Sequence, residues 1–309
     1  MGHIAILGVF VADTTYRADR APKLGETVLG NDFALGPGGK GSNQAVAAAR
    51  AGGNVHFISK LGRDLFADMG MQIWQEAGVT PAVTHHEDGA TGAAYIFVEE
   101  ATGQNAIIIC PGVAGTISAK DVEAHADLVG SADVFMTQLE QPLASAIRGL
   151  EIAKAGGATT ILNPAPAADL PAAVFPLCDY VTPNESEAEA LTGLPVTNIE
   201  TATSAGKQLL DMGVGAALLT LGDNGALLVT KSDAIHVPAF DAGPVVETTG
   251  AGDAFNGGFA VALSEGQSPV EATRFGAATA ALSVTKPGTA PSMPKRDEID
   301  LLLRAAKAT

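Results

Sequence analysis

The feature that most constrains this chain is an alternation of short apolar runs with alanine-rich stretches along most of its length. The apolar runs predict buried strands at His3–Val9, Val55–Leu61, Asp133–Met136, Thr159–Leu162, Tyr180–Thr182 and Ala216–Leu221. The stretches between them predict helices at Ser42–Ala51, Asp64–Glu76, Leu143–Ala155, Ser186–Leu191 and Thr203–Met212. Such alternation is typical of right-handed βαβ units. We therefore predict an α/β fold, with a mostly parallel central sheet and helices on both faces.

Two segments break this rhythm. Thr14–Leu35 is punctuated by Arg, Pro and Gly, and the β-type runs Ala93–Val98 and Ala106–Ile109 flank a turn. We expect these segments, at about residues 14–36 and 92–111, to form a small β-sheet lid. The whole chain, residues 1–309, would be a single domain that includes this lid. A late hairpin at Ala226–Val237 precedes helices at Asp253–Leu263 and Val270–Val284. The apolar lid strands predict a homodimer formed by lid pairing.

Composition excludes several partners. With 47% apolar and 17% charged residues the chain is globular, and its net charge of −16 argues against nucleic acid or an anionic membrane as a partner. An anionic substrate must therefore be held by local donors. Two distant cysteines, Cys110 and Cys178, indicate a reducing compartment. The apolar run Ile4–Ala12 has no basic residues before it and ends at Asp13, so we expect a buried strand in a cytoplasmic protein.

The stretch Thr248–Phe259 places two hydroxyl residues, two glycines around an alanine and one acid before an apolar helix. Glycines and a helix start together present backbone N–H groups and the positive end of the helix dipole, which forms a cradle for an anion. Asp253 is a negative charge inside this cradle. A carboxylate there can take a proton from a hydroxyl while the backbone stabilises a transferring phosphoryl group. The alternative is an ordinary N-cap aspartate.

A second glycine run, Gly36–Gly41, satisfies G-x-G-x-x-G and opens a helix. A dinucleotide-binding loop should close the first strand, however, and that strand ends near Val9. An NAD-dependent oxidoreductase would also leave the cradle at Gly250–Asp253 unexplained. Lys40 and Asn43 on a rigid turn suit a polyhydroxylated ligand, whose hydroxyls need paired donors and acceptors. The alternative is a helix start with a surface lysine.

The chain resembles the ribokinase family of sugar kinases, which also includes adenosine kinase and fructokinases. The resemblance rests on motifs in the family's order and spacing, and it covers about His3 to Leu303. The matching stretches are Gly25–Val28, Gly38–Ala45, Gln138–Glu140, Asn163–Pro166, Thr182–Glu189, Thr220–Gly222 and Gly250–Asp253.

The resemblance implies a role for each matching position. Asp253 would be the base that deprotonates the sugar hydroxyl, and the backbone at Gly250, Ala251 and Gly252 would form the anion hole, with the Asp253 N–H as a further donor. The sugar-contacting positions would be Val11, Asp13, Gly39, Lys40, Gly41, Asn43 and Glu140. The ATP-binding positions would be Asn184, Thr220, Gly222, Gly225 and Gly252. Glu187 would help to position Mg²⁺. The pair Asn184 and Glu187 can also be interpreted as a helix capping box. Glu140 also reads as a solvated strand-end acid.

Two positions depart from the family's pattern. Ribokinases usually have an asparagine where this chain has Val11, so one sugar hydroxyl loses a partner or the preferred sugar lacks a group. They often have aspartate at the position of Glu247, where it supports a monovalent cation. The matching K⁺ contacts would be Glu247, Thr249, Ser283, Lys286, Gly288 and Ser292, several of them through backbone carbonyls.

We therefore expect an ATP- and Mg²⁺-dependent sugar kinase, with K⁺ as an activator and D-ribose phosphorylated on its 5-hydroxyl. A nucleoside kinase, or a kinase for another pentose or hexose, stays open. The polar set at positions 13, 40, 43 and 140 favours a small polyol, and 5% aromatic residues provide few rings to stack on a base. A non-catalytic sugar sensor would not need Asp253.

Overall fold

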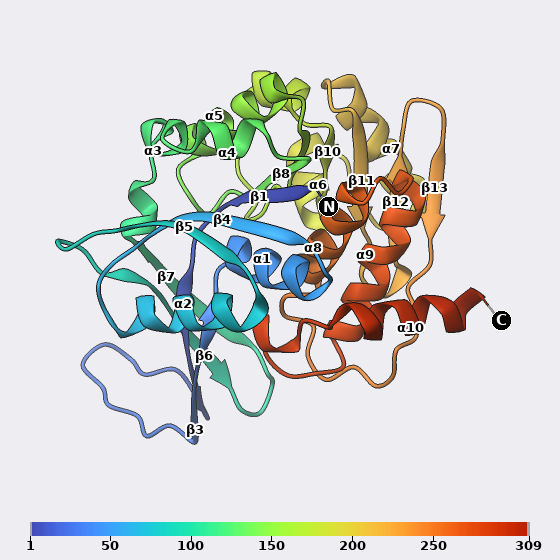
Figure 1. Cartoon of the computed structure of the whole chain (residues 1–309). Helices are drawn as coiled ribbons and strands as arrows, with labels where there is room; N and C mark the ends of the chain where they lie inside the picture. Colours follow the sequence, from blue (N-terminus) through green and yellow to red (C-terminus); the bar gives the residue numbers. More distant parts are fainter. Residues whose placement is uncertain (1, 308–309) are drawn as a thin grey trace.

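The computed structural model describes residues 2–307 (Figure 1). Within them, the main sheet has nine strands in the order β13-β12-β11-β10-β9-β8-β1-β4-β5. These are β1 (His3–Leu7), β4 (Asn54–Leu61), β5 (Thr80–His85), β8 (Val134–Thr137), β9 (Thr159–Leu162), β10 (Tyr180–Val181), β11 (Ala216–Thr220), β12 (Ala226–Val229) and β13 (Ala234–Val237). Neighbouring strands are parallel from β5 across to β11, and β12 is antiparallel to both β11 and β13. The predicted mostly parallel sheet is confirmed.

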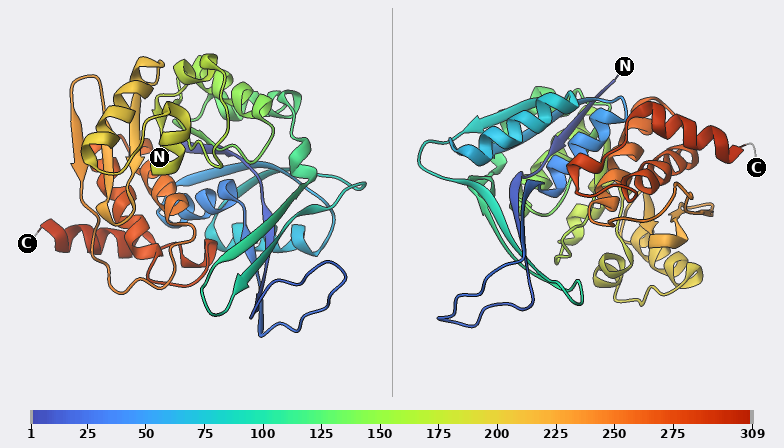
Figure 2. Two further views of the ribbon diagram at one scale, coloured as in Figure 1. Left: turned by 180° about the vertical axis from the view of Figure 1, so that it is seen from behind. Right: turned by 90° about the horizontal axis from the view of Figure 1, so that it is seen from below.

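Strand β1 shows how the sheet divides the core. Ile4 and Ile6 belong to one apolar cluster and Ala5 and Leu7 to another, because side chains alternate across a strand. The first cluster is covered by α1 (Lys40–Arg50), α2 (Leu65–Ala77), α8 (Ala251–Ser264), α9 (Pro269–Ser283) and α10 (Arg296–Lys307). The second is covered by α3 (Ala119–Glu123), α4 (Ala126–Gly130), α5 (Leu143–Gly156), α6 (Glu185–Thr192) and α7 (Ile199–Asp211). Figure 2 shows both layers.

Small residues bring α8 close to both of its neighbours. A Cβ on Gly257 would lie 2.6 Å from the Cβ of Ala47 on α1, and one on Gly258 would lie 2.4 Å from Oγ1 of Thr279 on α9. Larger residues at these glycines would push the helices apart. The close approach sets the start of α8 beside the start of α1.

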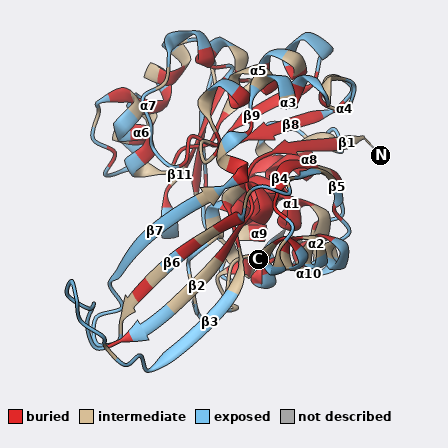
Figure 3. Cartoon of the chain, turned by 90° about the vertical axis from the view of Figure 1, so that its left-hand side faces the viewer, coloured by how far each residue is buried: buried red, intermediate tan, exposed pale blue. Residues whose placement is uncertain are grey.

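The lid is a separate sheet of four strands in the order β3-β2-β6-β7 (Figure 3). Its strands are β2 (Val11–Ala18), β3 (Asp32–Gly38), β6 (Thr91–Glu99) and β7 (Asn105–Gly112). Figure 3 shows them extending away from the buried core with much of their surface exposed. The lid confirms the sequence-based expectation, although β2 begins at Val11, three residues earlier than predicted and with only three residues between it and the end of β1.

Several elements were not predicted. Strand β5 lies at the edge of the sheet, has no buried residue and contains Pro81, so it lacks the apolar run of a central strand. The short helices α3 and α4 and the terminal α10 were also missed. Helix α7 begins at Ile199 because Asn198 caps it, accepting from the Thr201 N–H. In the part of the chain described, no helix has the length and apolar character needed to span a membrane.

Candidate active site

Polar side chains gather where the parallel strands end. Gln138 and Glu140 follow β8, Asn163 follows β9 and Thr182 follows β10. Helices α1 and α8 begin at this same edge of the sheet. Open α/β sheets bind ligands at the carboxyl ends of their strands, so this edge is the candidate active site.

Asp253 lies at the centre of the site, on the first turn of α8. The N-cap of that helix is Gly250, at φ 82°, so the N-cap interpretation of Asp253 is wrong. The Asp253 carboxylate is 7% exposed; Oδ2 accepts from Nδ2 of Asn43 at 3.1 Å and Oδ1 accepts from Nε2 of Gln44 at 3.0 Å. Burial raises the pKa of Asp253, while the charge of Lys40 and the two amide donors act to lower it.

The cradle before α8 is open on one side. A Cβ on Gly252 would meet no atom within 4 Å. The Ala251 N–H donates to the carbonyl of Thr248 at 3.1 Å, so this predicted anion-hole donor is already used within the turn. In residues 2–307 the N–H groups of Gly252 and Asp253 have no protein acceptor. These two N–H groups therefore remain for an anion.

The carboxylate of Glu140 contacts the start of α1. Its Oε2 accepts from the Lys40 N–H at 2.7 Å. Burial raises the pKa of Glu140 to about 7. Because its carboxylate is bonded to the start of α1 and the residue is only partly exposed, Glu140 is not a freely solvated strand-end acid. Gly39 precedes the helix at φ 88°, and a Cβ there would lie 2.5 Å from the Val9 carbonyl oxygen. A Cβ on Gly41 would lie 2.7 Å from the α-carbon of Gly8, so Gly41 packs against the end of β1.

Asp13 reaches the site from β2 of the lid. Burial, and after it the charge of Asp253, raise the pKa of Asp13 to about 6. A Cβ on Gly38 would lie 2.2 Å from Oδ2 of Asp13, so glycine makes room for this carboxylate. Val11 is two residues earlier on the same strand face and is 3% exposed. An apolar side chain therefore stands beside the carboxylate.

The predicted nucleotide positions lie on two adjacent strand ends. Asn184 is the N-cap of α6 and forms a reciprocal capping box with Glu187, which confirms the capping interpretation. Burial raises the pKa of Glu187. The Thr220 N–H donates to the Pro183 carbonyl at 3.0 Å, which brings the end of β11 beside the start of α6. Gly225 has φ 89° in the turn that follows. The turn also contains Gly222, at φ 55°, at the start of the short helix η3 (Gly222–Asn224).

The residues predicted to bind K⁺ lie on two loops that meet beside the cradle. The N–H groups of Val246 and Glu247 donate to the Val284 carbonyl, and Oε2 of Glu247 accepts from the Gly288 N–H at 2.8 Å. Thr249 is two residues after Glu247 and directly precedes Gly250, the N-cap of α8. The hydroxyls of Ser283 and Ser292 already donate to backbone carbonyls at 2.8 Å. A donating hydroxyl keeps its oxygen lone pairs, so this second loop offers a cation both these oxygens and backbone carbonyls.

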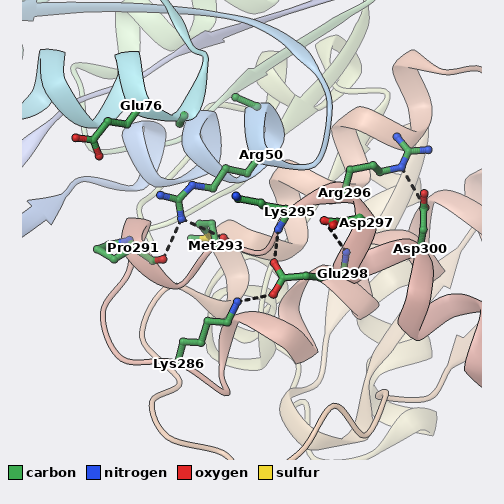
Figure 4. A pocket seen from close by; sticks show the side chains of 12 residues that line it. Arg50, Glu76, Lys286, Pro291, Met293, Lys295, Arg296, Asp297, Glu298 and Asp300 are labelled. Atoms are coloured by element: carbon green, nitrogen blue, oxygen red, sulfur yellow. Dashed lines mark hydrogen bonds and ion pairs between the residues drawn. The ribbon is translucent and has the colours of Figure 1, made fainter.

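The far side of this second loop is held by two cationic side chains (Figure 4). Nη1 of Arg50, at the end of α1, donates to the carbonyls of Ala290, Pro291 and Met293 at 2.9–3.1 Å. Nζ of Lys286 lies 2.7 Å from Oε1 of Glu298 on α10, so its ammonium is engaged by that carboxylate. These contacts tie the loop, including the short helix η4 (Ala290–Ser292), to α1 and α10.

The comparisons with known proteins agree with this geometry. The sequence profile described as pfkB family carbohydrate kinase matches residues 1–296. The chain belongs to this family. It is 38% identical to a ribokinase of Haemophilus influenzae, covering 96% of both chains, and 36% identical to a deoxyribokinase of Salmonella typhi, covering 96% of this chain and 97% of that one. An Arabidopsis thaliana ribokinase structure, complexed with ribose and ATP, superimposes with a TM-score of 0.94 at 32% identity and covers 98% and 99% of the two chains.

As a member of the pfkB family, the chain is a sugar kinase that transfers a phosphoryl group from ATP to an alcohol group. The oxidoreductase alternative is wrong, and the glycine run that suggested it joins β3 of the lid to α1 rather than closing β1. ATP-dependent chemistry in this family implies a divalent metal. Across residues 2–307 no cluster of three acidic, His or Cys side chains could hold a metal. A single carboxylate such as Glu187 fits Mg²⁺, which takes its other ligands from phosphates and water.

Five buried polar residues of this pfkB-family site were not assigned roles from the sequence. They are Gln44, Gln138, Asn163, Thr182 and Asn256, and each is at most 6% exposed. Four of them lie within motifs that carried the resemblance, and Asn256 lies three residues beyond the Gly250–Asp253 motif. A sequence pattern could have pointed to these residues. Each is a polar residue that lies close after a buried strand or within an apolar helix.

Proposed function

We propose that this kinase transfers the γ-phosphate of ATP to the 5-hydroxyl of D-ribose, with Asp253 as the general base. The observation that carries the proposal is the Asp253 carboxylate, buried and oriented by two amide donors, beside the free N–H groups of the cradle. The Haemophilus influenzae ribokinase and the Arabidopsis thaliana ribokinase complexed with ribose and ATP support the choice of sugar.

The sugar lies between the start of α1 and the lid. Asp13 and Glu140 accept hydrogen bonds from its hydroxyl groups, and the positive charge of the Lys40 ammonium offsets the negative charge of the surrounding carboxylates. Oδ1 of Asn43 is buried and has no protein partner among the described residues, so it is an acceptor for a further hydroxyl. Gly39 allows the backbone to approach the ligand closely.

The nucleotide occupies the neighbouring strand ends. Asn184, Thr220, Gly222 and Gly225 contact ATP, and Glu187 helps to hold Mg²⁺. Held by Glu187, Mg²⁺ would supply positive charge that offsets the negative charge of the phosphates. Asp253 takes the proton from the attacking hydroxyl, and the N–H groups of Gly252 and Asp253 donate to the transferring phosphoryl group.

The Asp253→Asn variant tests the base assignment. We expect kcat to fall by about two to four orders of magnitude, with much smaller changes in the affinity for sugar and ATP, because general-base catalysis acts on the transition state. The measurement is steady-state kinetics with ribose, after thermal unfolding has shown that the variant is folded. A variant that keeps more than about a tenth of the wild-type kcat would refute the assignment.

A second candidate substrate is 2-deoxyribose. Val11 places an apolar side chain on the strand face of Asp13, and a Salmonella typhi deoxyribokinase is among the relatives. A sugar hydroxyl that is buried beside an apolar side chain has no hydrogen-bond partner, which costs binding free energy. A sugar that lacks this hydroxyl avoids that cost.

K⁺ activates the enzyme by binding between the two loops beside the cradle. The Glu247 carboxylate and backbone carbonyls of the second loop form a donor set suited to a large, weakly hydrated cation. Bound there, the cation would stabilise the backbone at Gly250 that shapes the anion hole.

The enzyme forms a homodimer through the outer face of the lid. On this face the rings of Tyr16 and Phe33 lie 5.1 Å apart, and Ile108 is 63% exposed. Asp13 points to the opposite face because side chains alternate along β2. Replacing Tyr16 and Ile108 by glutamate should yield a monomer in analytical ultracentrifugation, whereas Leu301→Glu, at an exposed position on α10, should leave the dimer intact. A wild-type protein that sediments as a monomer would refute this interface.

A further inference from the structure

Gln44 uses nearly all of its hydrogen-bonding capacity inside the protein. The side chain is fully buried, one residue after Asn43, at the start of the second turn of α1. Its Nε2 donates to Oδ1 of Asp253 and to Oδ1 of Asn163, both at 3.0 Å. Its Oε1 accepts from Nε2 of Gln138 at 2.5 Å. The amide therefore joins the Asp253 carboxylate to the ends of two parallel strands.

The network continues from Asn163 back to the cradle. Nδ2 of Asn163 donates to the Thr182 carbonyl at 3.1 Å, and the Thr182 hydroxyl donates to Oδ1 of Asn256 at 2.7 Å. Nδ2 of Asn256 donates to the Gly252 carbonyl at 2.8 Å. The buried polar side chains thus form a path from Asp253 through the ends of β9 and β10 to Gly252, the neighbouring residue of α8, and Gln138 after β8 branches from it at Gln44.

The orientation of the Gln44 amide is determined by its neighbours. If the amide were flipped, Oε1 would face two acceptor oxygens, on Asp253 and Asn163, and Nε2 would face the donor nitrogen of Gln138. Oε1 of Gln138 in turn lies against two glycines, since a Cβ on Gly8 would be 2.5 Å from it and one on Gly41 2.8 Å. Because the ionised Asp253 carboxylate can only accept hydrogen bonds, the arrangement that satisfies the Gln44 amide is the one in which an N–H group points at Asp253.

We propose that Gln44 is a positioning residue for the phosphoryl-transfer reaction, which orients the Asp253 carboxylate and stabilises its ionised form. The inference rests on the proposed role of Asp253 as base. Asn43 supplies the second donor to the carboxylate, but its other amide atom is left for the sugar. Gln44 has no such second use, because its remaining partners all belong to the protein.

The test compares Gln44→Met with Gln141→Met. Methionine keeps the approximate shape of glutamine but removes the donor. Gln141 is a matched control, because it is also a buried glutamine, and it bonds to Thr137 and the Gln138 carbonyl rather than to Asp253. For Gln44→Met we expect kcat to fall about 10- to 100-fold, as for loss of one hydrogen bond to a charged group, and KM for ribose to change less than about threefold.

The pH dependence separates positioning from a general loss of structure. The charged groups that act on Asp253 are Lys40 on α1, Asp13 on the lid, Glu140 after β8 and Glu187 on α6, and all of them remain in the variant. Removing an N–H donor disfavours the carboxylate, so the acid limb of the kcat profile should move about one unit to higher pH. A ¹³C titration of the Asp253 carboxyl, assigned by comparison with Asp253→Asn, should show the same displacement.

The outcomes are distinguishable. If Asp253→Asn is inactive and the Gln44→Met titration equals that of the wild type, the positioning role is refuted while the base assignment stands. If Asp253→Asn stays active, the base assignment itself fails. Should Gln44→Met not fold, Gln138→Met removes the donor that orients the Gln44 amide. We then expect a smaller displacement in the same direction, and an unchanged titration would refute the proposal.

Discussion

The backbone N–H of Lys40 lies 2.7 Å from Oε2 of Glu140, although the two residues are 100 positions apart in the chain. This hydrogen bond joins the start of α1 to the end of β8 and turns the carboxylate toward the candidate sugar site. The bond and the Lys40 charge act to lower the pKa of Glu140, but burial outweighs both and raises it to about 7. Glu140 therefore changes charge near neutral pH.

The first prediction follows from that pKa. Between the ordinary value of 4.5 and about 7 the folded protein binds more protons at Glu140 than the unfolded chain does, so its contribution to stability falls as pH rises through this range. Glu140→Gln removes the ionisation and should stabilise the unliganded protein at pH 8 by about 1–3 kcal/mol, with little change at pH 4. Urea unfolding at both pH values measures this. Equal effects at pH 4 and pH 8 would contradict it.

The second prediction concerns the glycine that makes room for Asp13. A Cβ on Gly38 would lie 2.2 Å from the Asp13 carboxylate oxygen, so Gly38→Ala must displace that side chain. We expect KM for ribose to rise about tenfold, through loss of one hydrogen bond to a charged group. A double-mutant cycle with Asp13→Ala is the control. If the two effects simply add, the alanine acts on something other than Asp13.

The third prediction concerns Val11. Val11→Asn supplies a hydrogen-bonding amide beside Asp13 and should raise kcat/KM for ribose relative to 2-deoxyribose and arabinose by about threefold to tenfold. The measurement is kcat/KM for the three sugars with both proteins. Unchanged ratios would mean that position 11 does not contact the sugar.

The fourth prediction concerns the cation. Adding K⁺ to a cation-free assay at constant Mg²⁺ should raise kcat. Glu247→Ala should raise the half-activating K⁺ concentration about tenfold, since it removes the carboxylate beside the Gly288 N–H. Asp241→Asn changes another acid of the same loop, bonded within its own turn, and serves as the control. A rate indifferent to K⁺ would exclude the site.

Local sequence signals predicted most of the fold. Runs such as Thr159–Leu162 and Ala216–Leu221 contain only apolar residues and threonine, because a central strand is covered on both faces, so they could be recognised without tertiary information. Strand β5 gave no such signal, because this edge strand has no buried residue and tolerates Pro81. The Asn184–Glu187 capping box was also readable, since both partners lie within one helical turn.

By itself, the sequence determined the alternation of strands and helices, the lid and the glycine cradle around Asp253, because these depend on periodicity and on backbone preferences of neighbouring residues. The tertiary structure alone decided which side chains meet at the base. Asn43 and Gln44 reach Asp253 across more than 200 positions because Gly257 lets α8 pack closely against α1. The tertiary structure also decided that Asp253 lies within the first turn of α8 rather than at its N-cap. It likewise decided that the Ala251 N–H donates to the Thr248 carbonyl. Partners of buried polar groups depend on helix approach and strand register, and neither is a local property of the chain.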